Sequence, residues 1–457
     1  MNRAIVYLLI ALTEALISAV HAQNVPQRVA ILGDSITYDG RWVTQVEASL
    51  RANQEFATAE IINFGLGSET LSGLSEAGHA DGKFPRPCLH ERLARILAAF
   101  KPTLVLACYG MNDGIYQPLD LTRTKAFQNR AVKLKAEVEA QGAKIIWITP
   151  PLYKVDRPAE DLIHYDAVLD NFSLWLVSQS TNGWQIIDIR PDLRQAIVAE
   201  KAQNPQFIYA ADGVHPGEDG HRFIADSITR QLWSILKLSG KPEVPAKTAL
   251  AILRERNQLL KHAWLSHTRH TRPGVPQGLP MVQANAEAAK LMADYRTAIS
   301  KVSDWKGYRR LDFTVAGRAG LLVCPNQPAP GNPWIWRTEF FGHEPQGDIA
   351  LLGRGFHVAY LDVQDLYGAP SALEAMDAFY DDVTKTYQLS DKAVMEGFSR
   401  GGLFAFNWAT LRPNQVAGLY VDAPVCDFKS WPLGKGVGSG SPKDWQKLLQ
   451  AYRLTEA

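Results

Sequence analysis

Apolar and polar residues alternate in a regular way over the first half of the chain. Between residues 27 and 190, five short apolar runs have the composition of buried strands, and they read RVAILGDS (28–35), IINFGLG (61–67), TLVLACYG (103–110), KIIWITPP (144–151) and WQIIDI (184–189). The segments between them carry apolar residues at helical spacing. Strands that alternate with helices predict a parallel sheet covered by helices on both faces. A helix over residues 220–240, stopped by a glycine, closes this unit.

A second alternating stretch begins near residue 310. Its apolar runs predict five further strands, LDFTVAG, AGLLVCP, GFHVAYLDV, AVMEGFS and VAGLYVDAPV. Residues 250–300 have the pattern of two helices separated by TRPGVPQGLP, whose prolines and glycines cannot continue a helix. We therefore predict one α/β domain over 23–240, a linker and helical segment over 241–305, and a second α/β domain over 306–457.

The N-terminus has the pattern of a secretory signal peptide over residues 1–22. Arg3 supplies the positive charge, residues 4–13 form an apolar core, and Val20-His21-Ala22 fits a cleavage site. Glu14 interrupts the apolar run, which argues against a membrane-spanning helix, and no later segment is long and apolar enough to span. The sequence predicts an exported protein, secreted or periplasmic.

The overall composition is that of a soluble globular protein. The chain has 457 residues, of which 46% are hydrophobic and 21% charged, and a formal net charge of +1. Without a polybasic block, nucleic acid is not an expected partner. Four cysteines do not make a disulfide scaffold in a chain of this length. We expect Cys108 and Cys324, both in apolar runs, to be buried free thiols. The sequence does not decide whether the chain contains one disulfide bridge.

A serine stands at the end of the first predicted strand, in GDSIT (33–37). In a parallel α/β sheet, ligands bind at the carboxyl ends of the strands. Ser35 is therefore placed where a nucleophile belongs, with its backbone N–H free to donate at a helix start. Taken alone, the motif fits a helix N-cap serine better.

Two more polar blocks follow the next two predicted strands, GLGSET (65–70) and GMNDG (110–114). A tetrahedral oxyanion needs several hydrogen-bond donors aimed at one point. The Gly67-Ser68 turn can supply a backbone N–H and Asn112 its side-chain amide. Together with the N–H of Ser35, these groups are the predicted oxyanion donors.

A fourth block, DGVHP (212–216), comes after the fifth predicted strand and opens the last helix. Asp212 and His215 are three residues apart, so on one turn their side chains share a face. An aspartate in this place fixes the tautomer of the histidine, and the histidine takes the proton of the serine. The order of the four blocks predicts a Ser35–His215–Asp212 triad.

These four blocks resemble those of the SGNH, or GDSL, hydrolase family: GDS with Ser35, the turn NFGLGSET, GMND with Asn112, and DGVH with Asp212 and His215. The resemblance covers about residues 27–240. It implies a flavodoxin-like three-layer α/β/α sandwich and hydrolysis of esters or thioesters without a metal or other cofactor. Members of the family act on plant polysaccharides, lysophospholipids and thioesters.

One position departs from the family pattern. The glycine of the second block falls on Ser68, with Gly67 before it. The donor is a backbone N–H, so a serine serves there if the turn allows it, and either amide remains a candidate. With export and the aromatic residues Tyr38, Trp42, Tyr109 and Tyr116 near these blocks, we favour acyl esters on carbohydrate as the substrate. A lipid acyl hydrolase and a non-catalytic carbohydrate-binding protein are the alternatives.

The C-terminal stretch contains GFSRGG (397–402), with Ser399 between a predicted strand and a predicted helix. This G-x-S-x-G context resembles the nucleophile elbow of an α/β-hydrolase. That fold places its acid and histidine after the serine, but the last histidine of the chain is His357, and 457 − 399 = 58 residues follow Ser399. We expect an incomplete α/β-hydrolase-like unit, explained by a truncated gene, a frameshift or a fragment of a longer protein. In it, we expect His357 to lie in a strand core, His343 to contact substrate, and Ser399 to be inactive.

Overall fold

The computed structural model describes residues 27–156 and 165–455. The predicted signal peptide lies outside the described residues. By its internal contacts the chain forms two compact units. The first contains the described residues up to Asp39 together with Thr58–Leu236 and Thr268–Pro273, and the second contains Gly40–Ala57, Lys237–His267 and the described residues from Gly274 onward.

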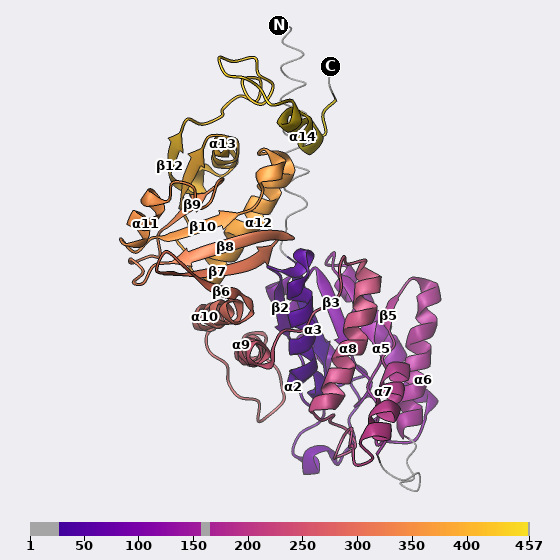
Figure 1. The fold of residues 1–457 in the computed structure, drawn as a ribbon. Coiled ribbons are helices and arrows are strands. Elements are labelled where there is room, and N and C mark those ends of the chain that lie inside the picture. The colour runs from indigo at the N-terminus through magenta and orange to yellow at the C-terminus, as the bar shows by residue number, and fades with distance from the viewer. Residues whose placement is uncertain (1–26, 157–164, 456–457) are drawn as a thin grey trace. The chain divides into compact units, whose positions relative to one another are not determined.

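The first unit is built on a five-stranded sheet with the order β2-β1-β3-β4-β5. Its strands are β1 (Arg28–Gly33), β2 (Glu60–Asn63), β3 (Leu104–Cys108), β4 (Lys144–Ile148) and β5 (Gln185–Ile187). Every neighbouring pair is parallel. This is the flavodoxin-like order, in which the carboxyl ends of all strands lie at one edge of the sheet. The predicted parallel sheet is confirmed (Figure 1).

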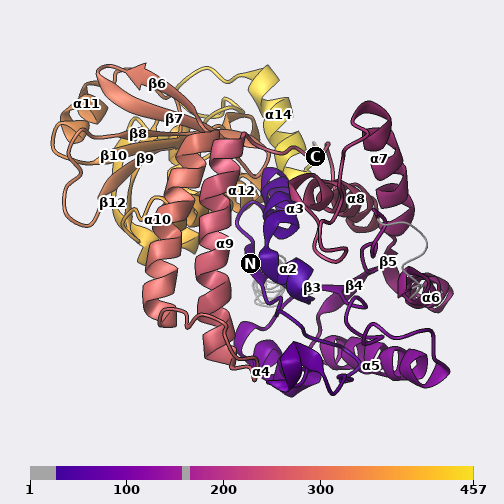
Figure 2. The same ribbon diagram turned by 90° about the horizontal axis from the view of Figure 1, so that it is seen from below.

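Helices cover both faces of this sheet, as the alternating sequence pattern predicts. They are α2 (Ser35–Asp39), α4 (Leu89–Phe100), α5 (Leu121–Glu139), α6 (Tyr165–Ser178), α7 (Arg190–Gln203) and α8 (Glu218–Leu236), with short 3-10 turns at His79–Gly82 and Gln179–Asn182. Figure 2 shows α4 and α5 on one face and α7 and α8 on the other. The central strands β1 and β3 are buried along nearly their whole length, which explains their unbroken apolar sequences.

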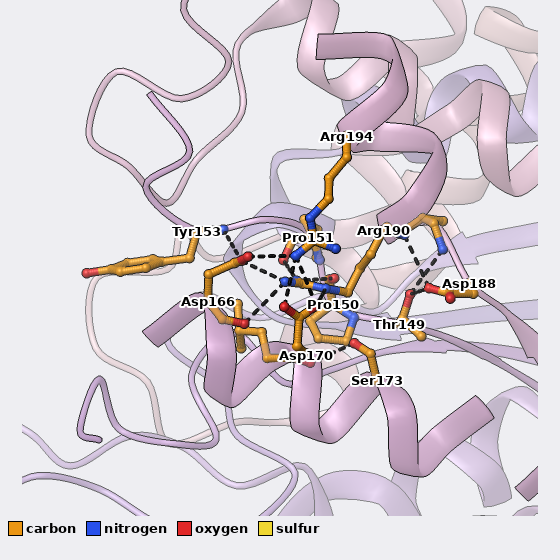
Figure 3. A network of polar contacts seen from close by, with 12 residues as sticks. Thr149, Pro150, Pro151, Tyr153, Asp166, Asp170, Ser173, Asp188, Arg190 and Arg194 are labelled. Atoms are coloured by element: carbon orange, nitrogen blue, oxygen red, sulfur yellow. Dashed lines mark hydrogen bonds and ion pairs between the residues drawn. The ribbon is translucent and has the colours of Figure 1, made fainter. Parts of the chain in front are cut away.

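A buried arginine fixes the loop that follows β4 (Figure 3). Arg190 donates from Nη1 to the carbonyl oxygens of Pro150 and Pro151, at 3.3 and 2.8 Å, and from Nε to Asp170 at 2.9 Å. Pro150 lies so close to Gly110 that a Cβ at this glycine would be 2.8 Å from the proline ring. The Arg190 network therefore supports, through Pro150, the loop that carries the GMND block.

The second unit contains a seven-stranded mixed sheet of order β12-β11-β9-β10-β8-β7-β6. The strands are β6 (Lys301–Trp305), β7 (Tyr308–Val315), β8 (Arg318–Cys324), β9 (Trp334–Arg337), β10 (His357–Leu361), β11 (Ala393–Phe398) and β12 (Val416–Asp422). The pairs β6–β7, β7–β8 and β8–β10 are antiparallel, and the pairs β10–β9, β9–β11 and β11–β12 are parallel.

Its helices are α3 (Arg41–Ala52), α9 (Lys247–Thr268), α10 (Met281–Ile299), α11 (Gln346–Leu352), α12 (Pro370–Thr386), α13 (Gly401–Leu411) and α14 (Pro442–Tyr452), with short 3-10 turns at Gln54–Phe56, Gln364–Leu366 and Pro413–Gln415. The two helices expected between 250 and 300 are confirmed as α9 and α10. Buried ion pairs join these helices: Arg256 contacts Glu47 at 3.0 Å, and Arg296 contacts Asp382 at 2.5 Å.

Two strands of the second sheet escaped the sequence analysis, which predicted five. The first, β6, is a polar edge strand whose residues are exposed or half-buried, so it lacks an apolar run. The second, β9, has four buried residues between a proline-rich loop and an aromatic loop, too short for a periodicity to show. Sequence-based domain bounds stay a prediction.

Two smaller expectations can be compared with the described residues. Cys108 and Cys324 are buried free thiols as predicted, and the half-buried Cys88 and exposed Cys426 are also free. No helix in the part of the chain that the structure describes combines the length and hydropathy needed to cross a membrane.

Candidate active site

Three side chains from distant parts of the first unit form a continuous chain of hydrogen bonds. The Ser35 hydroxyl lies 2.9 Å from Nε2 of His215, and Nδ1 of His215 lies 2.6 Å from Oδ2 of Asp212. Because an ionised carboxylate only accepts hydrogen bonds, Nδ1 carries the proton and Nε2 presents its lone pair to the hydroxyl. The arrangement can therefore move the proton of Ser35 to His215, and the structure brings together the three residues that the sequence analysis named.

The loop between residues 212 and 215 holds the aspartate in place. Oδ1 of Asp212 accepts the backbone N–H groups of Val214 and His215, both at 2.8 Å. Burial raises the pKa of Asp212, but the hydrogen bonds from the side chain and backbone of His215 and from Val214 outweigh it and lower that pKa below its usual value. The carboxylate is thus kept ionised to orient the histidine.

Ser35 is the first residue of α2, directly beyond the carboxyl end of β1. The turn into the helix is tight, since a Cβ at Gly33 would lie 2.1 Å from Oγ1 of Thr37. The first N–H groups of a helix have no partner within it, so the backbone N–H of Ser35 is available to a ligand. The end of β1 and the start of α2 therefore present the hydroxyl and the backbone N–H of Ser35 at the same place.

The GLGSET block forms a tight turn after β2. The N–H of Glu69 donates to the carbonyl of Leu66 at 3.2 Å, and Ser68 has φ of 64°. A positive φ at the third position belongs to a type II turn, where glycine is preferred. Ser68 therefore takes up the conformation of the glycine that it replaces. Within the described residues, the N–H groups of Gly67 and Ser68 donate no hydrogen bond, so both stay available.

A buried ion pair fixes this turn from behind. Glu69 is fully buried, and its carboxylate accepts Nε and Nη2 of Arg92, both at 2.7 Å. Its Oε2 also accepts the hydroxyl of Tyr109 at 2.6 Å. Nη2 of Arg92 further donates to the carbonyl of Phe64 at 2.6 Å, so the arginine ties the two sides of the turn together. Sequence reasoning missed Arg92, because nothing in an amphipathic helix marks one arginine as buried.

Asn112 is buried and its amide is held in one orientation. Nδ2 donates to the carbonyl of Glu69 at 3.1 Å, while Oδ1 accepts Nη1 of Arg86 at 2.9 Å and the hydroxyl of Tyr116 at 3.1 Å. Arg86 is itself fixed by a bidentate pair with Glu76, at 2.7 and 2.6 Å. With its acceptor side saturated by two donors, Asn112 has a second Nδ2–H that can bind an oxyanion.

Two further carboxyl groups are buried around the site. Oδ1 of Asp113 accepts the N–H groups of Leu71 and Ser72, at 2.8 and 2.6 Å, which joins the GMND loop to the chain after the turn. Burial raises the pKa of Asp113 to about 6. Burial likewise raises the pKa of Asp34 to about 7, against the hydrogen bond that Asp34 accepts from Ile36 N–H.

The aromatic residues near the motifs divide into two groups. Trp42 and Tyr109 are fully buried, so the idea that they face a substrate is wrong: Trp42 is a core residue and Tyr109 supports Glu69. Tyr38 and Tyr116 are half-buried, and Tyr116 stacks on Tyr165 with ring centroids 4.8 Å apart. Of the four aromatic residues that the sequence places near the motifs, only Tyr38 and Tyr116 are therefore accessible enough to contact a ligand.

Ser399 lies in a strand-turn-helix elbow, between β11 and α13, with φ of 50°. Its backbone is fixed on both sides, since its N–H donates to Asp422 and its carbonyl accepts Val425 N–H. Its hydroxyl, however, has no hydrogen bond to a side chain of the described residues. The ring of His343 packs on Phe398 at 5.7 Å instead. His357 is a core residue of β10, as expected, and burial lowers its pKa to about 4.

Within residues 27–156 and 165–455, no three His, Cys, Asp or Glu side chains are arranged to hold a metal ion.

Comparison with known proteins identifies the first unit. The model of the GDSL-like Lipase/Acylhydrolase family matches residues 31–223. This part of the chain is therefore a GDSL-like lipase/acylhydrolase (SGNH) domain, and the resemblance read from its four motifs is confirmed. The match does not extend to the second unit.

Among solved structures, two matches each cover slightly less than half of this chain. A catalytic mutant of Axe2, an acetylxylan esterase from Geobacillus stearothermophilus, is 18% identical with a TM-score of 0.36, over 46% of this chain and 95% of that one. LAE5, an alpha/beta hydrolase enzyme from the metagenome of Lake Arreo, Spain, is 20% identical with a TM-score of 0.34, over 45% and 94%. No curated protein matches the chain.

The left-handed conformation of Ser68 generates a first prediction. Replacing it by glycine removes the steric cost of a positive φ, about 1–2 kcal/mol, but adds entropy to the unfolded chain, about 0.4–1 kcal/mol. We expect Ser68→Gly to be at least as stable as the wild type in urea unfolding and equally active. Ser68→Val, with a branched side chain, should lose both stability and activity. A destabilised glycine variant would show that the serine side chain itself holds the turn.

The buried carboxyl of Asp34 generates a second prediction, on pH dependence. Its pKa of about 7 in the folded protein exceeds the ordinary value of 3.8, so the folded state binds the extra proton. The stability that this group contributes is present below about pH 4 and is lost as the pH rises through about 7. Asp34→Asn keeps an oxygen for the N–H of Ile36 but cannot titrate.

The free energy of unfolding of Asp34→Asn should therefore rise relative to that of the wild type between about pH 4 and pH 7 and level off above, by a few kcal/mol in all (about 1.4 for each pKa unit crossed). Urea unfolding of both proteins at several pH values measures the difference. Asp81→Asn, which changes an exposed carboxylate, is the control and should follow the wild type. Parallel curves for Asp34→Asn and wild type would contradict the prediction.

Proposed function

We propose that residues 31–223 form a serine esterase in which Ser35 is the nucleophile, His215 the general base and Asp212 the residue that orients it. The observation that carries this proposal is the unbroken line of hydrogen bonds from the Ser35 hydroxyl through both ring nitrogens of His215 to Asp212. A serine hydroxyl becomes a useful nucleophile only when such a base takes its proton. The family to which this domain belongs hydrolyses acyl esters, which agrees with this chemistry.

The reaction would proceed in two steps. The Ser35 oxygen attacks the ester carbonyl while its proton moves to Nε2 of His215, and the carbonyl oxygen becomes negative in the tetrahedral intermediate. His215 then gives that proton to the leaving alcohol as the carbon–oxygen bond breaks. Water, deprotonated by the same histidine, then attacks the acyl-serine. The bond between the acyl carbon and the Ser35 oxygen breaks, His215 returns its proton to that oxygen, and the carboxylic acid is released. The N–H groups of Ser35 and of Gly67 or Ser68 and the amide of Asn112 would stabilise the oxyanion.

We infer that the substrates are acyl esters, above all acetyl esters, on carbohydrates. The half-buried ring of Tyr38 lies in the same short helix as Ser35, and such rings pack against the apolar faces of sugars, whereas the Tyr116 ring already contacts Tyr165 and Arg86. The predicted signal peptide agrees with a polymeric substrate outside the cell. A panel of acetylated xylan, p-nitrophenyl esters of rising chain length and lysophospholipid tests this choice. Preference for long acyl chains would assign a lipid substrate instead, and binding to polysaccharide without any turnover would leave only a binding function.

The second unit is best explained as an α/β-hydrolase-like sheet. Its strands lie in the order β7-β8-β10-β9-β11-β12, so β10 comes before β9 in space although it follows β9 in the sequence. The strand β8 is antiparallel to both of its neighbours, and the elbow serine follows β11. This agrees with the strand-turn-helix context of a G-x-S-x-G nucleophile. Because no base contacts the hydroxyl of Ser399 in the described residues, we propose that this serine takes no part in the hydrolysis.

A fluorophosphonate probe, which labels activated serines, distinguishes the two serines directly. We expect labelling of the peptide that contains Ser35 and none of the peptide that contains Ser399. Ser35→Ala should abolish labelling and ester hydrolysis, because only this serine has a base within hydrogen-bond distance. Ser399→Ala is the matched control and should change neither. Hydrolysis that survives Ser35→Ala but disappears with Ser399→Ala would overturn the assignment.

The role of Asn112 is tested by kinetics. The oxyanion exists only along the reaction path, so Asn112→Ala should lower kcat by about 10²–10³ with little change in KM. Asn204→Ala, at the exposed end of α7, provides the control and should leave both constants unchanged. A change confined to KM would make Asn112 an ordinary substrate contact.

A further inference from the structure

A short segment far along the sequence returns to the first unit. Residues Thr268–Pro273 begin at the last residue of α9 and belong, by their contacts, to the first unit. Thr271 donates its hydroxyl to Glu91 at 2.9 Å, and the carbonyl of Thr268 accepts Nε of Arg95 at 2.7 Å. These bonds attach the segment to α4 and place the next side chain, Arg272, beside the turn that carries the proposed oxyanion donors.

The guanidinium of Arg272 lies flat against Gly67. Its Nε, Cζ and Nη2 atoms are 3.0, 3.2 and 3.3 Å from the point where a Cβ of this glycine would lie. Nearly equal distances to three atoms of one plane mean that the plane faces the turn, so the N–H groups point along the surface of the turn. Any side chain at position 67 would displace the arginine. Arg272 can therefore take this position only because residue 67 is a glycine.

Aromatic groups complete the surroundings of this cation. Cζ of Arg272 is 5.6 Å from the centre of the Phe84 ring, within the range of a cation–π contact. Tyr38, within α2, lies close enough to be affected by the charge: burial raises the pKa of its hydroxyl, and the positive charge of Arg272 acts in the opposite direction. Phe84 and Tyr38 are both half-buried, so they leave part of their rings open to a ligand.

The charge of Arg272 has no carboxylate beside it in the described residues. Nη1 donates to the carbonyl of Pro273 at 2.9 Å, while Nε is buried and has no acceptor. Two further arginines at the site, Arg86 and Arg92, are already paired with Glu76 and Glu69. A buried donor without an acceptor is costly and is satisfied when a ligand supplies one.

We propose that Arg272, with Phe84, Tyr38 and the face of Gly67, forms a subsite for a carboxylate on the sugar whose ester is cleaved. This inference rests on the proposed esterase function and specifies its substrate as an acidic acyl-sugar. A planar guanidinium is suited to a planar carboxylate. One unpaired arginine matches a single negative charge, whereas a phosphate dianion would call for more donors.

Two monoacetates test the subsite: methyl glucuronoside monoacetate and methyl glucoside monoacetate, which differ only in a carboxylate against a hydroxymethyl group. The wild type should show a kcat/KM about tenfold or more higher for the glucuronoside ester, falling as salt is added. Arg272→Gln should remove this preference through KM and leave the glucoside ester within about twofold of wild type. Arg269→Gln, an exposed arginine of the same segment, is the matched control and should behave as wild type.

Three results would overturn the subsite while leaving the esterase intact. They are equal rates on both esters in the wild type, an Arg272→Gln variant that slows both esters alike, and a stronger preference for the 6-phosphate of the glucoside ester. Binding of methyl glucuronoside to Ser35→Ala, measured by calorimetry, tests the subsite without catalysis and should be lost on adding Arg272→Gln. If neither ester is hydrolysed but Ser35→Ala binds methyl glucuronoside in an Arg272-dependent way, the esterase is rejected and the subsite is kept. If Ser35→Ala does not bind methyl glucuronoside, or binds it equally well with Arg272→Gln, the subsite is rejected.

Discussion

The site of the first unit depends on one buried ion pair, Glu69 with Arg92. An oxyanion donor needs an N–H group that has no other acceptor, on a backbone that is fixed in position. A turn at the end of a strand, however, lacks the regular hydrogen bonds of a helix or sheet that would fix it. Arg92 supplies that rigidity from below, since it donates to the carboxylate of Glu69 and to the carbonyl of Phe64. The backbone carbonyl of Glu69 then orients Asn112, so two of the proposed donors share one anchor.

The buried carboxyl groups around the site also hold its loops in place by accepting hydrogen bonds. Asp34, Glu69 and Asp113 are all removed from water at the carboxyl ends of the first three strands, where unpaired N–H groups from the loops converge. Asp113 and Asp34 each accept backbone N–H groups, and Glu69 has an arginine. Carboxyl oxygens can satisfy several donors at once, which suits them to the crowded start of a loop. Near the surface, by contrast, Asp212 stays ionised and turns toward His215.

The two serines show that the geometry of a nucleophile and its chemistry are separate properties. Ser399 stands on a strained elbow with a positive φ, whereas Ser35 simply begins a short helix. What separates them is the partner of the hydroxyl: His215 lies within hydrogen-bond distance of the Ser35 hydroxyl, whereas no side chain of the described residues bonds the hydroxyl of Ser399. A local motif encodes the turn, but a base is brought in by a distant part of the chain.

Sequence alone determined the features that depend on local pattern. The parallel sheet of the first unit, the helices α9 and α10, and the roles expected of Ser35, Asn112, Asp212 and His215 follow from periodicity and from four short motifs at strand ends. Their meeting is predictable because parallel strands end at one edge of the sheet. The motif pattern also places Ser68 where the family has a glycine, and in the structure Ser68 adopts the positive φ of that glycine within a turn closed by a hydrogen bond.

Tertiary structure decided everything that depends on contacts between distant segments. Arg86, Arg92 and Arg272 look alike in the sequence as arginines of helices and loops, yet one orients Asn112, one anchors the turn, and one lies on Gly67. Trp42 and Tyr109 could equally have faced a ligand, and only packing shows that they are buried. The physical reason is that an arginine or an aromatic ring suits both a surface and a core, and its surroundings are supplied by chain segments that lie up to some 200 positions away, as Gly67 and Arg272 do (272 − 67 = 205).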